Sequence, residues 1–179
     1  MKRIAFLLCL VLGSLVVAQD KTPPTTLKGV LLEQLRTTHN EKDWFAPANI
    51  AVQGLTAEQA NWTPGKGNSN HSVAQEVNHL IFWDTWALAK FKGEKPAKYS
   101  GNNEDTFNGA DSKQWAAMVK QLDEVLTEWE KAVEAADDQK IAAQASMIAH
   151  VGVHNAYHVG QIVYIRKLQG SWDANQGVK

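Results

Sequence analysis

The strongest constraint on the fold is the segment from Gln114 to Ala136, QWAAMVKQLDEVLTEWEKAVEAA, whose apolar positions recur every three or four residues. That spacing gathers the apolar side chains on one face of an α-helix and leaves the charged ones on the other. Three other long segments share the spacing, and no stretch alternates apolar and polar residues as a half-buried strand does. The sequence therefore predicts an all-α domain in which four helices bury their apolar faces against one another.

Signals for helix ends divide the chain. The first helix is expected from about Thr26, and Pro47 should kink or restart it, because proline lacks an amide hydrogen. Residues 72–75 (SVAQ) have the pattern of a capping box, so a second helix should run from there to a stop at Gly93. Residues 111–114 (DSKQ) repeat this start signal and predict the beginning of the third helix.

The fourth helix is expected to begin between Asp138 and Ser146 and to end near Leu168, because Gly170 supplies a stop signal. The connection at 93–110, between the second and third helices, is long for a bundle. It could be a crossover connection.

The segment 1–18 has the three parts of a secretory signal peptide. Lys2 and Arg3 are followed by the apolar run IAFLLCLVLGSLVV, and small side chains precede a cleavage site after Ala18. The apolar run is shorter than the roughly 20 residues that a transmembrane helix needs, although an uncleaved anchor is the alternative. We expect an exported protein, periplasmic or secreted, with a leader at 19–25, a domain at 26–172 and a tail at 173–179.

Composition narrows the chemistry. The only cysteine, Cys9, lies in the predicted signal peptide, so the mature chain would have no thiol nucleophile and no disulfide. Loss of Lys2 and Arg3 reduces the 18 basic residues to 16, against 19 acidic ones, and no basic run stands out. We therefore expect no mechanism based on a protein thiol, no nucleic-acid partner and no membrane contact after cleavage.

Three of the six histidines, His150, His154 and His158, follow one another at every fourth position. They share one face of a helix, and His154 and His158 stand in its apolar stripe where leucine is usual. Buried imidazoles need partners, since their polar atoms lose water. Hydrogen bonds within the core are one solution, and a metal ion shared by the two rings is the other. The metalloprotease pattern H-E-x-x-H is absent.

A third metal ligand would have to come from another helix. His79 borders the most apolar part of the second helix and is the candidate, with a hydrogen-bonded histidine at the core edge as the alternative. His71, at a helix start, is expected to be exposed, and His39 could face either way. His150 is the weakest ligand candidate of its helix.

Support for the imidazoles is harder to assign. Glu76 and Asp84 could each accept an imidazole N–H, although solvent exposure is the favoured interpretation for both carboxylates. Gln161, one turn beyond His158, and His150, one turn before His154, are further candidates for a polar neighbour of the ligands. Gly160 suggests close packing of a neighbouring helix or room at the site, because glycine costs a helix up to about 1 kcal/mol; Gly160→Leu should then misplace His158.

Two tryptophans of the second helix, Trp83 and Trp86, could line a ligand pocket or a subunit interface. Core packing is the more usual role of such residues.

Several motifs together resemble the DinB-like superfamily of four-helix metalloproteins: VNHLIFWD around His79, HNAYHVGQIVYIRKLQG from His154, NHSVAQEVNH and GLTAEQANWTP. The resemblance covers Thr26 to Trp172. It implies an up-down-down-up bundle in which His79, His154 and His158 hold a divalent metal such as zinc or nickel. Characterised members use small intracellular thiols in S-transfer and isomerisation, and others are held to be metal-dependent hydrolases. Predicted export is a departure from this pattern, since such thiols are scarce outside the cytosol.

Two classes of function follow. The first is a metal-dependent enzyme, a hydrolase or a thiol-dependent transferase, in which three histidines leave one coordination position open for an unidentified small-molecule substrate. The second is a non-catalytic, metal-stabilised binding or interaction module. Three imidazoles suit zinc, nickel, copper and iron alike, and a homodimer is expected only by analogy.

Overall fold

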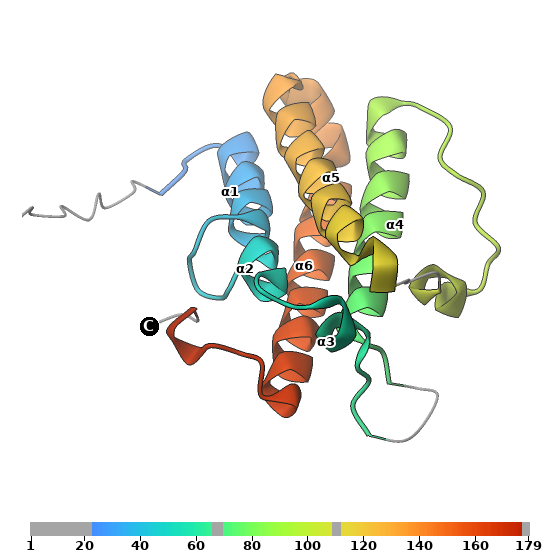
Figure 1. Cartoon of the computed structure of the whole chain (residues 1–179). Coiled ribbons are helices and arrows are strands. Elements are labelled where there is room, and N and C mark those ends of the chain that lie inside the picture. Colours follow the sequence, from blue (N-terminus) through green and yellow to red (C-terminus); the bar gives the residue numbers. More distant parts are fainter. Residues whose placement is uncertain (1–22, 66–69, 109–111, 177–179) are drawn as a thin grey trace, which may run out of the picture.

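The computed structural model describes residues 23–65, 70–108 and 112–176, and within them every regular element is a helix (Figure 1). The predicted all-α class is confirmed. The four long helices are α1 (Leu27–His39), α4 (Val73–Lys92), α5 (Trp115–Ala135) and α6 (Asp138–Gln169). The shorter elements are α2 (Ala48–Val52), α3 (Ala57–Asn61) and the 3₁₀ turns η1 (Asn103–Phe107), η2 (Ser112–Gln114) and η3 (Ala174–Gln176).

The long helices form a bundle in which α5 and α6 each pack against both α1 and α4. Figure 1 shows α1 and α4 on opposite sides, with α5 in front of α6. The core between them is apolar and includes the fully buried side chain of Trp129, whose indole N–H donates to the Asp84 carbonyl at 3.0 Å. The up-down-down-up order of the helices stays a prediction.

Helix ends follow local chemistry where the sequence carries a signal. Thr26 caps α1 by accepting a hydrogen bond from the Gly29 amide. Ser72 and Gln75 form both bonds of the predicted capping box at the start of α4. Gly93 ends α4 with a φ of 80°, a conformation that favours glycine because a Cβ would be strained there. These ends could be predicted because each depends on residues within one turn.

Two starts differ from expectation. Residues 112–114 form the 3₁₀ turn η2, so α5 begins at Trp115 and its N-cap, Gln114, makes no side-chain capping bond. The predicted capping residue Asp111 lies outside the described residues. The extra helix α3 begins at a second capping box, formed by Thr56 and Gln59, whose T-A-E-Q pattern the sequence analysis did not use.

The long connection after α4 positions part of the site. It returns along α4 (Figure 1), and η1 packs against that helix. The amide of Asn78 donates to the Thr106 carbonyl at 2.8 Å and to the Asn108 carbonyl at 2.6 Å. These bonds hold Thr106 and Phe107 beside the next residue of α4, His79.

The predicted signal peptide at 1–18, most of the leader and the end of the tail, 177–179, lie outside the described residues. Among the helices that are described, none is both long enough and apolar enough to span a membrane.

Candidate metal centre

The structure brings together the three histidines that the sequence singled out. His79 comes from α4, and His154 and His158 come from successive turns of α6. One ring nitrogen of each residue lies within 4.8 Å of those of the other two. The Nε2 atoms of His79 and His154 are 3.2 Å apart. Three imidazoles from two helices therefore converge on one point.

Burial keeps the rings of His79 and His154 neutral. Burial first, and then the nearby His158 ring, lower the pKa of His79 to about 3 and that of His154 to about 4. A neutral imidazole keeps a nitrogen lone pair free, which is the form that binds a metal ion. Both residues therefore remain in the ligating form throughout the neutral pH range.

Thr106 fixes the tautomer of His79. The Thr106 hydroxyl donates its hydrogen to the Asn103 carbonyl at 2.6 Å. The hydroxyl oxygen must therefore accept the hydrogen on His79 Nδ1, and the Nδ1 atom lies 2.5 Å from that oxygen. The proton of the ring is thus held on Nδ1, and Nε2 faces the other histidines without one. No sequence pattern points to Thr106, because this residue belongs to an irregular connection 27 positions from His79.

Glu76 has the same role for His158. The carboxylate can only accept, so His158 Nδ1 donates to Glu76 Oε2 at 2.6 Å and leaves Nε2 free. The expected solvent exposure of Glu76 is wrong, since the residue is 2 % exposed. The structure shows the other interpretation, in which Glu76 accepts a hydrogen bond from an imidazole N–H. The amide of Gln161 lies 3.2 Å from the same Nδ1, one turn along α6 as expected.

Asp84 is also buried, contrary to the exposure expected of it, but it contacts no imidazole of the cluster by hydrogen bond. Its Oδ1 accepts a bond from the Asn155 amide at 3.3 Å. Within the described residues, Asp84 Oδ2 and Asn155 Oδ1 have no hydrogen-bond partner. Burial raises the pKa of Asp84 to about 7. The sequence placed this carboxylate on the correct helix but could not give its environment.

Two further histidines border the cluster. His150 is exposed, and its Nδ1 donates to the Ser146 carbonyl one turn earlier at 2.6 Å. His71 is half-buried rather than exposed, because its ring stacks on Phe107 with centroids 3.8 Å apart. The other face of Phe107 stacks on His79 at 4.0 Å. Phe107 therefore packs between the His71 and His79 rings and holds the His79 ring in place.

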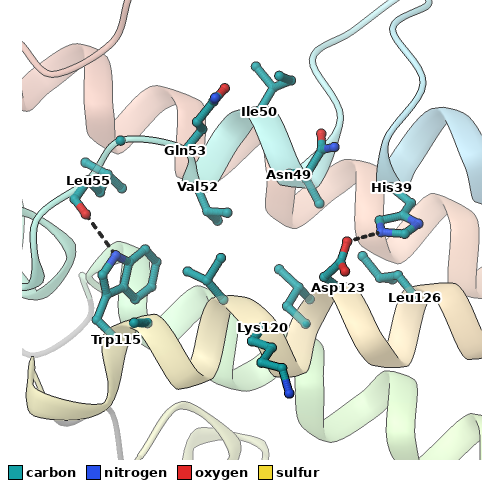
Figure 2. Close-up of a pocket in the computed structure, with 15 residues that line it drawn as sticks. His39, Asn49, Ile50, Val52, Gln53, Leu55, Trp115, Lys120, Asp123 and Leu126 are labelled. Carbon is teal, nitrogen blue, oxygen red and sulfur yellow. Dashed lines mark hydrogen bonds and ion pairs between the residues drawn. The ribbon is translucent and has the colours of Figure 1, made fainter.

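His39 lies elsewhere, at one end of a second cavity of about 620 Å³ that is lined by residues of α2 and α5 (Figure 2). Its ring bonds to Glu130 at 2.6 Å and to Asp123 at 2.9 Å. Burial alone would lower the pKa of His39, but these two carboxylates outweigh it and raise the pKa above its usual value. His39 is thus a core histidine with a carboxylate at each ring nitrogen.

The histidine cluster faces a cavity of about 750 Å³ between α4, α6 and η1. Aromatic and aliphatic side chains form much of its wall, and the described residues that line it include no lysine or arginine. The lining side chains besides the three histidines are those of His71, Trp83, Asp84, Trp86, Ala87, Asn103, Glu104, Phe107, Met147, His150, Val151, Tyr157 and Gln161. Trp83 and Trp86 are therefore partly exposed to a pocket, the first of the two roles considered for them.

Gly160 does not support the cluster. A Cβ added to this residue would meet nothing within 4 Å, and the residue is exposed. Neither expectation for Gly160 holds, since no neighbouring helix of the described residues packs closely against it and it does not line the histidine cavity. Gly160→Leu should leave His158 in place.

The donor set fits a divalent metal ion. Two imidazole nitrogens that bind one tetrahedral zinc at 2.0–2.1 Å are about 3.3 Å apart, close to the 3.2 Å between the Nε2 atoms of His79 and His154. The tautomers of His79 and His158 are set by Thr106 and Glu76 so that each presents a free Nε2. The cavity leaves space for a further ligand beside the three rings.

Comparison with known families gives one finding. A family model described as the DinB superfamily matches residues 48–162, a span that contains α2 to α5, most of α6 and all three histidines. Comparisons with curated proteins and with solved structures give no match.

Proposed function

Because this chain belongs to the DinB superfamily, we propose that it is an exported metal-dependent enzyme whose ion, zinc or nickel, is bound by His79, His154 and His158. The observation that carries the proposal is the set of hydrogen bonds behind the cluster. Thr106 and Glu76 hold the ring protons of His79 and His158 on Nδ1, so their Nε2 lone pairs point toward His154. Such hydrogen bonds behind the ligands are typical of metal sites.

Three protein ligands leave one coordination position for a substrate or a water molecule. A bound ion would supply Lewis acidity there, lowering the pKa of a water molecule toward 7 or binding a thiolate. The chain itself supplies the orientation of the rings and the apolar cavity wall. Phe107, Trp83 and Trp86 would hold an apolar part of the substrate beside the ion.

The cavity lining supports hydrolysis over thiol transfer. Small cellular thiols commonly carry carboxylates, and the described lining offers no lysine or arginine to pair with them. Glu104 adds a carboxylate to the wall instead. Predicted export supports the same choice, since thiols would be scarce. We therefore propose uncharged esters or amides with an apolar group as the substrate class.

The test combines metal content with activity. Protein purified without nickel resin or chelator should contain about one equivalent of a single transition metal. It should hydrolyse uncharged aryl esters or amides, lose this activity with a chelator and regain it with zinc or nickel. If the protein binds a metal and transfers groups to thiols but does not hydrolyse esters or amides, the reaction is thiol transfer and not hydrolysis. Absence of metal, with no uptake on addition, would contradict the metal site itself.

Thr106 provides a sharper prediction about the site. Thr106→Val keeps the shape of the side chain but removes the acceptor for His79 Nδ1–H, so it should weaken metal binding about 10- to 100-fold. Thr106→Ser keeps the hydroxyl and should bind within about threefold of the unchanged protein. Competition with a chelating dye measures both affinities. Equal affinities for the two variants would show that Thr106 does not orient a ligand.

A further inference from the structure

The second cavity, between α2 and α5, lies outside the histidine cluster. Its volume of about 620 Å³ suits a small organic ligand. Figure 2 shows Trp115 and His39 at its two ends. None of the described residues that line it also lines the histidine cavity. It is therefore a separate site, which the proposed reaction does not use.

Most of the wall of the second cavity is apolar. Val52 and Leu55 line it from α2 and the turn that follows, and Leu122 and Leu126 line it from α5. A ligand with an apolar body would remove these surfaces from water, which favours binding. The affinity of the cavity for a ligand should therefore depend mainly on the size and shape of an apolar group.

The Trp115 end of the cavity offers no free hydrogen-bonding group on the indole ring. The indole N–H donates to the Leu55 carbonyl at 3.0 Å, and indole has no other donor and no acceptor. The ring therefore presents only its apolar surface to a ligand. This end suits an aliphatic or, better, an aromatic group.

The His39 end carries negative charge. His39 donates from Nδ1 to Glu130 and from Nε2 to Asp123, because carboxylates only accept, so one imidazolium faces two carboxylates. Arg36 lies 3.9 Å from Glu130 and does not line the cavity. The bond from His39 occupies Asp123 Oδ1, and the Asp123 side chain is still 61 % exposed. Asp123 Oδ2 can therefore accept a further donor.

Lys120 does not cancel this charge. It is the one lysine among the described lining residues, and its Nζ lies 2.8 Å from Glu124 Oε1. Figure 2 shows its side chain directed away from α2. The ammonium group of Lys120 is thus paired outside the cavity, and the free charge at the wall is that of Asp123.

We propose that the second cavity binds a small organic amine, whose ammonium group donates to Asp123 and whose apolar body lies against Trp115 and the leucines. Asp123 follows Trp115 by eight residues on α5, a distance of about 12 Å along the helix. The ligand therefore needs a short chain between its charged and its aromatic end. The site requires no metal ion, because none of the three clustered histidines lines it.

The first test compares three probes of similar shape by titration calorimetry: 4-phenylbutylamine, uncharged 4-phenylbutanol and anionic 4-phenylbutyrate. Chelator-treated protein is used, because an amine could otherwise bind a metal ion. The amine should bind with a Kd below about 1 mM. It should bind about fivefold more tightly than the alcohol, a modest factor because Asp123 is exposed, and the acid should bind more weakly than either.

Salt provides a check on the cause of this preference. At about 1 M sodium chloride the amine and the alcohol should bind with more similar affinities, because salt screens an exposed ion pair. Equal affinities at low salt, or no binding of the amine, would overturn the proposal.

The second test removes the charge of Asp123. Asp123→Asn should weaken binding of the amine about fivefold and leave that of the alcohol within about twofold. The new amide oxygen can still accept from His39, so the bond to α1 is kept. Glu128→Gln removes the same charge from α5 outside the described lining and should change neither affinity by more than about twofold.

The third test fills the Trp115 end of the cavity. Ala116 lines the cavity but is exposed, so Ala116→Phe should fold and should weaken binding of both amine and alcohol at least about tenfold. Ala117→Phe adds the same ring to an exposed position outside the described lining and should leave both affinities unchanged. An amine affinity that Asp123→Asn or Ala116→Phe leaves unchanged would place the amine elsewhere and overturn the proposal.

Discussion

His79→Ala should remove the metal from the protein, leaving less than about a tenth of an equivalent by elemental analysis. The ligand that is lost is one of three, and the remaining pair comes from one helix, so no second helix would close the site. The fold should survive, because the partner left behind is the neutral Thr106 hydroxyl, which keeps its bond to Asn103. Circular dichroism checks that the helices remain.

The matched control for this loss is His150→Ala. His150 lies one turn before His154 on α6, but it is exposed and bonds to the Ser146 carbonyl rather than joining the cluster. Its variant should keep about one equivalent of metal. Equal loss in both variants would indicate nonspecific binding to surface histidines, and retention in His79→Ala would contradict the proposed ligand set.

His158→Ala should lose metal too, but at a greater cost in stability. Glu76 is buried, and removal of the imidazole leaves its carboxylate without its shortest hydrogen bond. Only the longer contact of Glu76 Oε1 with His71 Nδ1, at 3.5 Å, would remain, and loss of a partner from a buried charge pair destabilises proteins by up to about 3–5 kcal/mol. We therefore expect a lower melting temperature for His158→Ala than for His79→Ala. The difference would distinguish a ligand held by a buried carboxylate, Glu76, from one held by a neutral hydroxyl, Thr106.

The sequence predicted those features of the site that depend on local spacing. His154 and His158 were identified because two polar residues one helical turn apart interrupt an apolar stripe, and His79 because apolar residues surround it. Thr106 could not be identified in this way. Its position depends on bonds from Asn78 across a connection that has no periodic pattern.

Burial of single carboxylates was the least predictable feature. Glu76 and Asp84 lie two turns apart on α4, and both were expected in solvent, yet each faces α6. Helical spacing predicts on which face of a helix a residue lies. Whether that face is buried depends on where a neighbouring helix crosses it, which the spacing does not show. Gly160 shows the opposite case, since a residue expected in close contact is exposed.

Asp84 should make the folded state less stable as the pH rises from about 4 to about 7. Its pKa is about 7 in the folded chain because of burial, against an ordinary value of 3.8. In this range the unfolded chain releases the proton while the folded chain retains it, so deprotonation favours unfolding. Above pH 7 the folded chain must bury a charge. The total effect is of the order of a few kcal/mol.

The geometry around Asp84 gives an independent reason for a neutral carboxyl group. Asn155 already donates to Oδ1, while Asp84 Oδ2 and Asn155 Oδ1 both lack partners within the described chain. A proton on Oδ2 could donate to Asn155 Oδ1 and satisfy both atoms at once. The ionised carboxylate would leave two buried acceptors unpaired, which costs free energy.

Asp84→Asn should therefore stabilise the protein at pH 8 by about 2 kcal/mol and change its stability little at pH 4. Urea unfolding of the metal-free variant and of the metal-free unchanged protein at both pH values measures the difference, in which the titration of the histidine cluster cancels. Asp43→Asn, an exposed position before α2, should show no such pH dependence. Destabilisation of Asp84→Asn at pH 8 would mean that the folded chain stabilises the ionised carboxylate and that burial does not raise its pKa.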